Sequence, residues 1–228
     1  SEFKKYDEAL ALHLKALEMY RQLHQPQKVA LTINLLGNVQ IHAGHLTEGL
    51  ESLMESYRLR SEQQDIHGLA SSCLNIANAY TVSGDCHNAI EYAALGTEYC
   101  IAIGNNHRLP EHYTGLANIY LKFEHYPEAL RYAQKAIDIS TEQGDKRHLY
   151  LALECAAQAQ EKSGNLADAL RHYKQFIDIK QQVLNESTAH KTNTLLVQFD
   201  TERMQHDNEI LRLKAEEAEK QAEFYNRE

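Results

Sequence analysis

The sequence predicts an all-α protein, a right-handed superhelical solenoid of antiparallel helix pairs followed by one long C-terminal helix. Three observations lead to this prediction. A forty-residue pattern recurs without gaps along residues 4–184, and a fixed period of this kind is typical of stacked helical repeats. Glycine and proline number only 10 and 3 among 228 residues, which favours helix over irregular structure. Residues 186–228 contain neither glycine nor proline, so a single long helix is expected there.

The repeat is clearest in the stretch LLGNVQIHAGHLTEGL, residues 35–50. Shifts of forty residues align it with NIANAYTVSGDCHNAI (75–90), GLANIYLKFEHYPEAL (115–130) and CAAQAQEKSGNLADAL (155–170), and its end reappears in KKYDEAL (4–10). One position holds a small residue in all five copies: Ala9, Gly49, Ala89, Ala129 and Ala169. We expect two helices to cross there, because only a small side chain lets their backbones approach closely.

Each unit is predicted to contain two helices. The first, helix A, is expected over 27–43, 67–83, 107–123 and 147–163, and the second, helix B, over 47–63, 87–103, 127–143 and 167–184. Gly44, Gly84 and Gly164 mark the turn inside the unit, where a left-handed backbone costs glycine little. The third unit has Glu124 there, and Pro127 keeps the helix break.

The predicted organisation has three parts. Residues 1–3 (Ser-Glu-Phe) are interpreted as a scar of the expression vector. The solenoid spans 4–184, and the long capping or coiled-coil linker helix spans 186–228. Within the solenoid we expect a half repeat at 4–24 and full repeats at 27–64, 67–104, 107–144 and 147–184.

Bulk properties exclude several classes of function. A formal net charge of −9 argues against a nucleic-acid partner, because a phosphate binder needs a basic face. No apolar run approaches the roughly 20 residues of a membrane span, and no signal peptide is visible, so a cytoplasmic location without membrane contact is predicted. The cysteines are expected to be free, mostly buried thiols; they are Cys73, Cys86, Cys100 and Cys155.

The sequence offers no pattern for catalysis. Its 13 histidines include His42 and His45 in the opening stretch, but a helix break at Gly44 separates the two, and no HExxH or paired CxxC spacing occurs. The glycines match no phosphate-binding loop, and no predicted strand precedes them. Nothing resembles a nucleophile elbow. We therefore predict that these 228 residues have no enzymatic activity and hold no metal or cofactor, which leaves open an enzymatic domain elsewhere in a longer parent protein.

The repeat resembles the tetratricopeptide repeat. Leu36-Gly37, Gln40, Gly44, Leu46 and Gly49 follow the signature of that family. The usual unit has about 34 residues; the forty-residue unit is similar to the longer variety in kinesin light chains, cell-polarity adaptors and bacterial regulators. The resemblance implies a concave wall of A helices that binds a peptide or protein.

One column of this wall is polar where a core is apolar: Asn38, Asn78, Asn118 and Gln158. A primary amide carries one acceptor and two donors, so it can pair with both groups of an extended peptide backbone. In the long-unit members such an asparagine ladder holds peptides, and packing between repeats is the alternative role. Two flanking columns are expected to tune specificity: one holds Asn34, Leu74, Thr114 and Glu154, and the other holds His42, Val82, Lys122 and Lys162. The lysine of the chaperone-tail clamp is missing, which disfavours that ligand.

The tail fits a heptad pattern from residue 194, with Val197, Met204, Leu211 and Ala218 at d positions and Asn208 at an a position. An asparagine at a specifies register in a parallel dimer. These five residues are the predicted dimerisation contacts. The alternatives are that the first part caps the last repeat, or that the helix is partly frayed.

Residues 197–223 resemble the linker that follows such repeats in bacterial signalling proteins, most often before a diguanylate cyclase of the GGDEF type and sometimes before a histidine kinase. The leading hypothesis is a regulatory domain whose C-terminal helix controls such an output domain, with cyclic di-GMP signalling as the first expectation. A stand-alone adaptor or scaffold is the alternative.

Overall fold

The computed structural model describes residues 2–189, 191, 194, 197, 203 and 204. Regular structure in these residues is entirely helical. The helices are α1 (Glu2–Gln22), α2 (Pro26–His42), α3 (Leu46–Glu62), α4 (Ile66–Ser83), α5 (Cys86–Ala102), the 3₁₀ turn η1 (Asn106–Arg108), α6 (Leu109–Lys122), α7 (Tyr126–Gln143) and α8 (Lys146–Lys162). Helical structure resumes at residue 166 and continues through residue 189. Residues 1–180 form one compact unit, and 181–228 form a second, in which 181–189 are helical.

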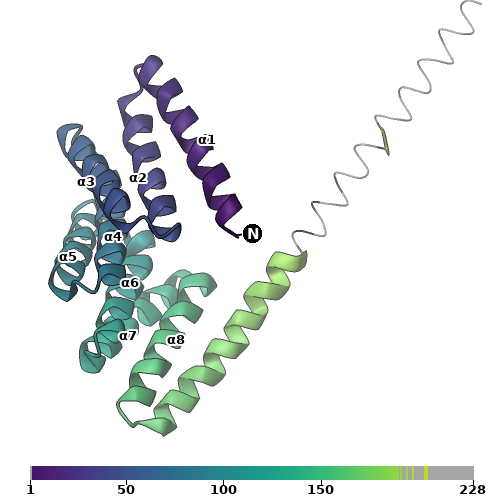
Figure 1. Ribbon diagram of the computed structural model, residues 1–228. Helices are drawn as coiled ribbons and strands as arrows, with labels where there is room; N and C mark the ends of the chain where they lie inside the picture. Colours follow the sequence, from purple (N-terminus) through teal and green to yellow (C-terminus); the bar gives the residue numbers. More distant parts are fainter. Residues whose placement is uncertain (1, 190, 192–193, 195–196, 198–202, 205–228) are drawn as a thin grey trace, which may run out of the picture. The chain divides into compact units, whose positions relative to one another are not determined.

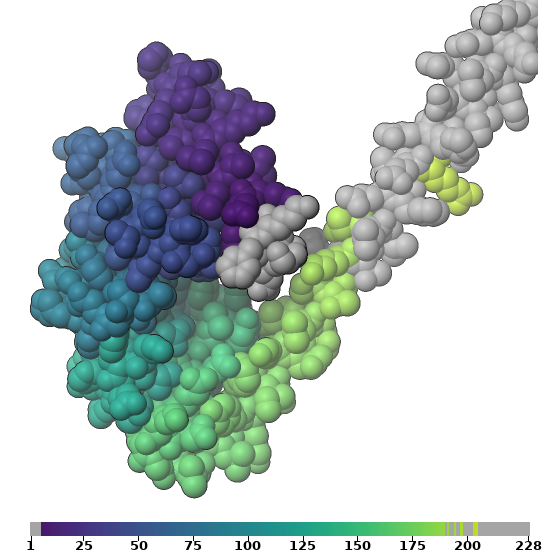
Figure 2. All heavy atoms as spheres, viewed as in Figure 1, coloured from purple at the N-terminus to yellow at the C-terminus, as the bar shows by residue number. Residues whose placement is uncertain are grey.

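The first unit is a stack of helical hairpins in chain order (Figure 1). Helix A and helix B of a repeat pair as α2 with α3, α4 with α5, and α6 with α7, while α1 is a B helix that packs on α2. Each B helix also contacts the next A helix, and successive A helices contact one another. In the space-filling view the colours of the chain from α1 to α7 follow one another as successive bands (Figure 2). The predicted all-α solenoid with a long last helix is confirmed.

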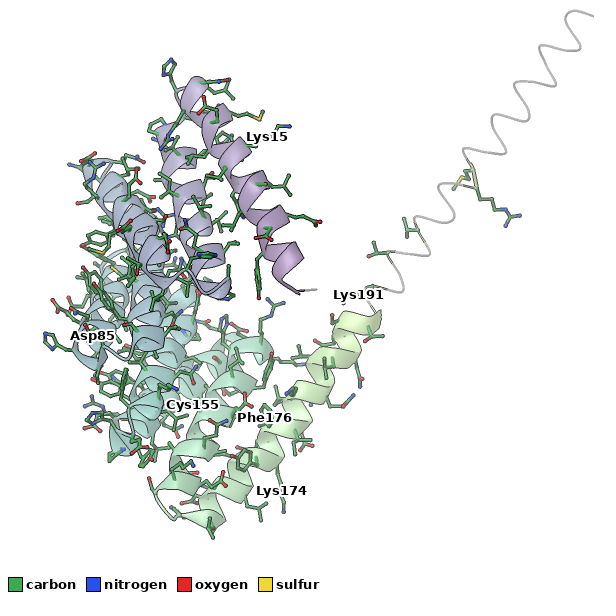
Figure 3. All side chains as sticks on the ribbon, viewed as in Figure 1. Lys15, Asp85, Cys155, Lys174, Phe176 and Lys191 are labelled. Carbon is green, nitrogen blue, oxygen red and sulfur yellow. The ribbon has the colours of Figure 1, made fainter. Side chains whose placement is uncertain are left out.

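The turns inside the repeats use a left-handed residue at one fixed position. Gly44, Gly84 and Gly164 have φ angles of 91°, 83° and 81°. Glu124 takes the same position in the third repeat at φ 64°, although it carries a side chain. In some repeats a side chain at the end of this turn caps the N-terminus of the next helix. Asp85, labelled in Figure 3, accepts a hydrogen bond from the backbone N–H of Asn88 at 3.1 Å, which satisfies one free donor of α5.

The helices of the first complete repeat cross at the two glycines that the pattern placed there. A Cβ atom built on Gly37 would lie 2.8 Å from the carbonyl oxygen of Gly49, and one built on Gly49 would lie 2.9 Å from that of Gly37. In the second and third repeats alanines that are fully buried occupy both positions: Ala77, Ala89, Ala117 and Ala129. Small residues therefore set the distance between helix A and helix B throughout.

The core combines these small residues with stacked tyrosines. Tyr80 of α4 stacks on Tyr92 of α5 with ring centroids 5.7 Å apart, and Tyr120 of α6 stacks on Tyr132 of α7 at 5.5 Å. The two pairs stand at equivalent positions of neighbouring repeats. They hold α4 on α5 and α6 on α7.

Candidate functional site

The wall formed by α2, α4, α6 and α8 contains a hollow between α2 and α4. Its volume is about 490 Å³, within the range of small-molecule and peptide pockets. Two A helices line it with the residues Asn38, Ile41, His42, Asn75, Asn78, Ala79 and Val82. The hollow therefore combines amide groups with an aliphatic floor.

The amide column lies at the surface. Asn78 and Asn118 are exposed, and Asn38 and Gln158 are half-buried. None of the four side chains makes a hydrogen bond to another described residue. Asn38 and Asn78 line the same hollow from neighbouring repeats. The hydrogen-bond donors and acceptors of these amides are therefore available to a ligand or to water.

Asn34 has a different environment from the rest of the predicted set. It is buried, and its Nδ2 donates to the Ser72 hydroxyl at 3.2 Å, while its Oδ1 accepts from Asn75 Nδ2 at 2.6 Å. Ser72 also accepts from the buried guanidinium of Arg60 at 3.0 Å. Both the donor and the acceptor of the Asn34 amide are therefore hydrogen-bonded to the next repeat. Asn34 contributes to packing between repeats and is not among the proposed ligand contacts.

The residues of the flanking columns also include both buried and exposed side chains. Thr114 is buried, and its hydroxyl has no hydrogen-bond partner among the described residues, so it too is set apart from the surface column. Lys122 and Lys162 are exposed. They occupy the repeat position of His42 and Val82, which line the hollow. In the first two repeats this position therefore lines the hollow.

Three residues of the hollow were not among the predicted contacts. Ile41, Ala79 and Asn75 all line it. Asn75 precedes Asn78 by three residues on α4, so helical spacing alone places the two on one face. That signal was available in the sequence, whereas the apolar floor depends on how α2 and α4 approach each other.

The buried histidine and cysteine side chains do not line the hollow. His112 of α6 is fully buried with no partner for either ring nitrogen among the described residues, and burial lowers its pKa to about 4. It fits beside Gly96, whose Cβ would lie 3.4 Å from the imidazole. Burial raises the pKa of the Cys73 and Cys155 thiols to about 12; Cys155 lies inside the stack (Figure 3). These groups stay uncharged at neutral pH and belong to the core.

The described part of the chain contains no cluster of three or more histidine, cysteine or acidic side chains placed to hold a metal ion. Its helices also include none with the length and apolar character needed to span a bilayer. Of the predicted dimerisation contacts, Val197 and Met204 are exposed, while Asn208, Leu211 and Ala218 lie outside the described residues. The dimer therefore stays a prediction.

Comparisons with known proteins agree with the architecture. A family model described as a tetratricopeptide repeat matches residues 1–27 and 111–142. No curated protein matches the chain. The fold is similar to that of BtubC from P. vanneervenii, with a TM-score of 0.69 at 16% identity over 78% of this chain and 74% of that one.

Two further solved structures share the fold. RapI in its apo form has a TM-score of 0.67 at 14% identity, covering 78% of this chain and 50% of that one. A signal transduction ATPase with a tetratricopeptide repeat sensor, from Pyrococcus horikoshii, has a TM-score of 0.62 at 22% identity, covering 79% of this chain and 29% of that one. The forty-residue helical hairpins, the family model that matches part of the chain and the shared fold together show a solenoid of helical hairpins that is similar to tetratricopeptide-repeat structures.

Proposed function

We propose that this solenoid binds an extended peptide, or an extended segment of a protein, in the groove lined by its A helices. The observation that carries the proposal is the contrast between asparagines on the same helices. Asn34 and Asn75 are hydrogen-bonded to each other, whereas Asn38, Asn78 and Asn118 make no side-chain hydrogen bond to a described residue although they recur at one position per repeat.

An extended peptide suits these amides chemically. Each side chain can accept from a peptide N–H and donate to a peptide carbonyl. A hydrogen bond of this kind contributes about 1 kcal/mol net, so a column of amides yields useful affinity with limited dependence on ligand sequence. Repeat solenoids present extended concave surfaces suited to such ligands.

The test replaces Asn78 and Asn118 together with alanine. An array of random dodecapeptides is probed with the 228-residue chain, and the tightest peptide is then titrated against both proteins. Loss of two to three amide hydrogen bonds, about 2–3 kcal/mol, weakens binding roughly 30- to 150-fold. Helicity and Tm stay close to wild type, because the two side chains are exposed and unpaired.

Asn106→Ala is the matched control. Asn106 is an exposed asparagine at the start of η1, away from the amide column. It is expected to leave peptide affinity unchanged. Peptides that bind the double variant as tightly as wild type would show that the asparagine column is not the contact surface.

We extend this proposal to regulation. One of the three similar structures named above has a tetratricopeptide repeat sensor, and the last repeat of this chain ends in a helix that continues through residue 189. Binding in the groove then controls a partner domain through that helix. A diguanylate cyclase is the first expectation and a histidine kinase the second, both from the resemblance of residues 197–223; a stand-alone adaptor is the alternative. The sequence downstream of residue 228 distinguishes them.

A further inference from the structure

We propose that the groove selects one class of peptide: an aliphatic side chain sits in the hollow between α2 and α4, and carboxylates of the same peptide lie opposite Lys122 and Lys162. This inference rests on the proposed function and specifies its ligand. It follows from a difference in chemistry between the two ends of the wall.

The end at α2 and α4 is aliphatic. Ile41, Ala79 and Val82 line the hollow between the amides, and Val82 is 66% exposed. Leu35 of α2, at the repeat position of Asn75, is 41% exposed. Covering aliphatic surface of this kind yields roughly 25 cal/mol per Å². The hollow contains no acidic or permanently charged side chain, so it suits an uncharged aliphatic group.

The other end is cationic. The position held by His42 and Val82 in the first two repeats is held by Lys122 and Lys162 in the last two. Neither lysine forms an ion pair with a described residue. Three exposed or half-exposed arginines of the solenoid do have acidic partners, as in the pairs Arg58–Glu62, Arg108–Glu111 and Arg171–Asp168.

The acidic residue next to Lys162 in the sequence has a hydrogen-bond partner of its own. Glu161 precedes Lys162 in sequence, but its carboxylate accepts a hydrogen bond from the Tyr173 hydroxyl at 2.7 Å on helix B. In a chain of net charge −9, two unpaired lysines aligned with the amide column provide charge complementarity for an acidic ligand.

Helix geometry sets the expected spacing in the ligand. Helices in contact lie about 9 Å apart, so Lys122 on α6 is about 14 Å from the centre of the hollow and Lys162 on α8 about 23 Å. An extended peptide advances about 3.3 Å per residue. The carboxylates are therefore expected about four and about seven residues from the aliphatic residue.

The test uses two sets of dodecapeptides, each made with a free and with an amidated C-terminus. Peptides of the first set contain one leucine, with glutamate, glutamine or lysine four and seven residues away from it. Peptides of the second set are identical except that serine replaces the leucine. Binding to the full chain is measured by fluorescence anisotropy. Glutamate peptides are expected to bind about tenfold more tightly than glutamine peptides, with a difference that shrinks in salt. Amidation distinguishes a terminal carboxylate from side-chain carboxylates.

Charge reversal at the lysines gives the decisive comparison. In Lys122→Glu/Lys162→Glu the preference is expected to invert toward lysine peptides. Lys174→Glu, an exposed lysine on the final helix (Figure 3), is the matched control and keeps the glutamate preference. Val82→Ser is expected to remove the leucine preference, and Ile101→Ser, an exposed aliphatic residue near the end of α5, to keep it.

The outcomes separate the two proposals. Peptides that bind through Asn78 and Asn118 but show no acid preference, or keep it after the lysine reversal, overturn this inference and leave the proposed function intact. Binding of polyanions such as single-stranded DNA that depends on the lysines but not on Val82 or the asparagines overturns it as well. Failure of every peptide to bind overturns both.

Discussion

At the scale of single residues, the crossing of α2 and α3 depends on Gly49. Helix propensity alone predicts that Gly49→Ala stabilises the protein by about 1 kcal/mol. The new Cβ, however, meets Ile41 Cγ1 at 2.5 Å and the Gly37 carbonyl oxygen at 2.9 Å. Overpacking of this kind costs about 1–3 kcal/mol, so we expect a net loss and a Tm several degrees lower.

Gly115→Ala provides the control for this prediction. A Cβ at Gly115 would meet only the Leu74 side chain, Cδ1 at 2.6 Å, and the end of that side chain can rotate. Thermal unfolding followed by circular dichroism is expected to show a stable or slightly raised Tm for Gly115→Ala and a lowered Tm for Gly49→Ala. Equal gains in both variants would mean that α2 and α3 are not in close contact.

The buried imidazole of His112 predicts a dependence of stability on pH. Its pKa is about 4 in the folded chain and about 6.5 when unfolded. Nearby Glu111 raises this pKa, while burial and Arg108 lower it. Between these values the unfolded chain binds more protons, so the free energy of unfolding decreases as pH falls from 6.5 toward 4. The full contribution is about 3 kcal/mol.

Urea unfolding at pH 7, 6, 5 and 4.5 measures this contribution. His112→Leu removes the titrating group, and its stability is expected to decline less steeply over that range than that of the wild type. His172, whose pKa is also lowered by burial, continues to titrate in both proteins. Parallel pH profiles would contradict the assignment of this dependence to His112.

At the scale of elements, the turn between α6 and α7 differs from its counterparts at one position. Glu124 has φ 64° where the other repeats have glycine. A left-handed conformation costs a residue with a side chain about 1–2 kcal/mol, partly offset by the entropy that glycine loses. Glu124→Gly is therefore expected to stabilise the protein by about 0.5–1 kcal/mol and to raise Tm by about 2–4 °C. Gly84→Ala, the reciprocal change at the equivalent turn, is expected to lower Tm. A lower Tm for Glu124→Gly would mean that the left-handed conformation of Glu124 does not destabilise this turn.

Helices and turns could be predicted because their signals are local. Repeat spacing, glycine at the turns and small residues at the crossings lead to helix ends within a few residues of those found. The start of α6 is later than expected, because η1 precedes it and Pro110 stands in its first turn.

The roles of individual asparagines were harder to predict. Asn34 and Asn38 are one turn apart on α2, and only the approach of Ser72 and Asn75 from the next repeat separates packing from exposure.

At the scale of the whole molecule, the amide column, the aliphatic hollow and the two lysines belong to one surface because successive A helices touch. No single repeat contains all three features. The proposed groove therefore depends on the stacking of repeats, and the affinity for the proposed peptide is expected to respond to interfaces far from any contact residue. In a solenoid each repeat is stabilised mainly by its immediate neighbours, so this dependence is stepwise along the stack.

Hydrogen exchange followed by mass spectrometry tests that stepwise stability. The central helices α4 to α7 have neighbours on both sides and are expected to exchange most slowly, whereas α1, which leaves Leu12 and Leu14 exposed, exchanges fastest. Leu17→Ala, in the buried contact of α1, is expected to speed exchange in α1 and α2 with little effect on α6 and α7. Leu116→Ala, at the centre of the stack, is expected to speed exchange most in the two repeats that contain α4 to α7, because its 2% exposed side chain belongs to the cluster that joins them. Uniform acceleration by Leu17→Ala would instead mean that the repeats unfold as one cooperative unit.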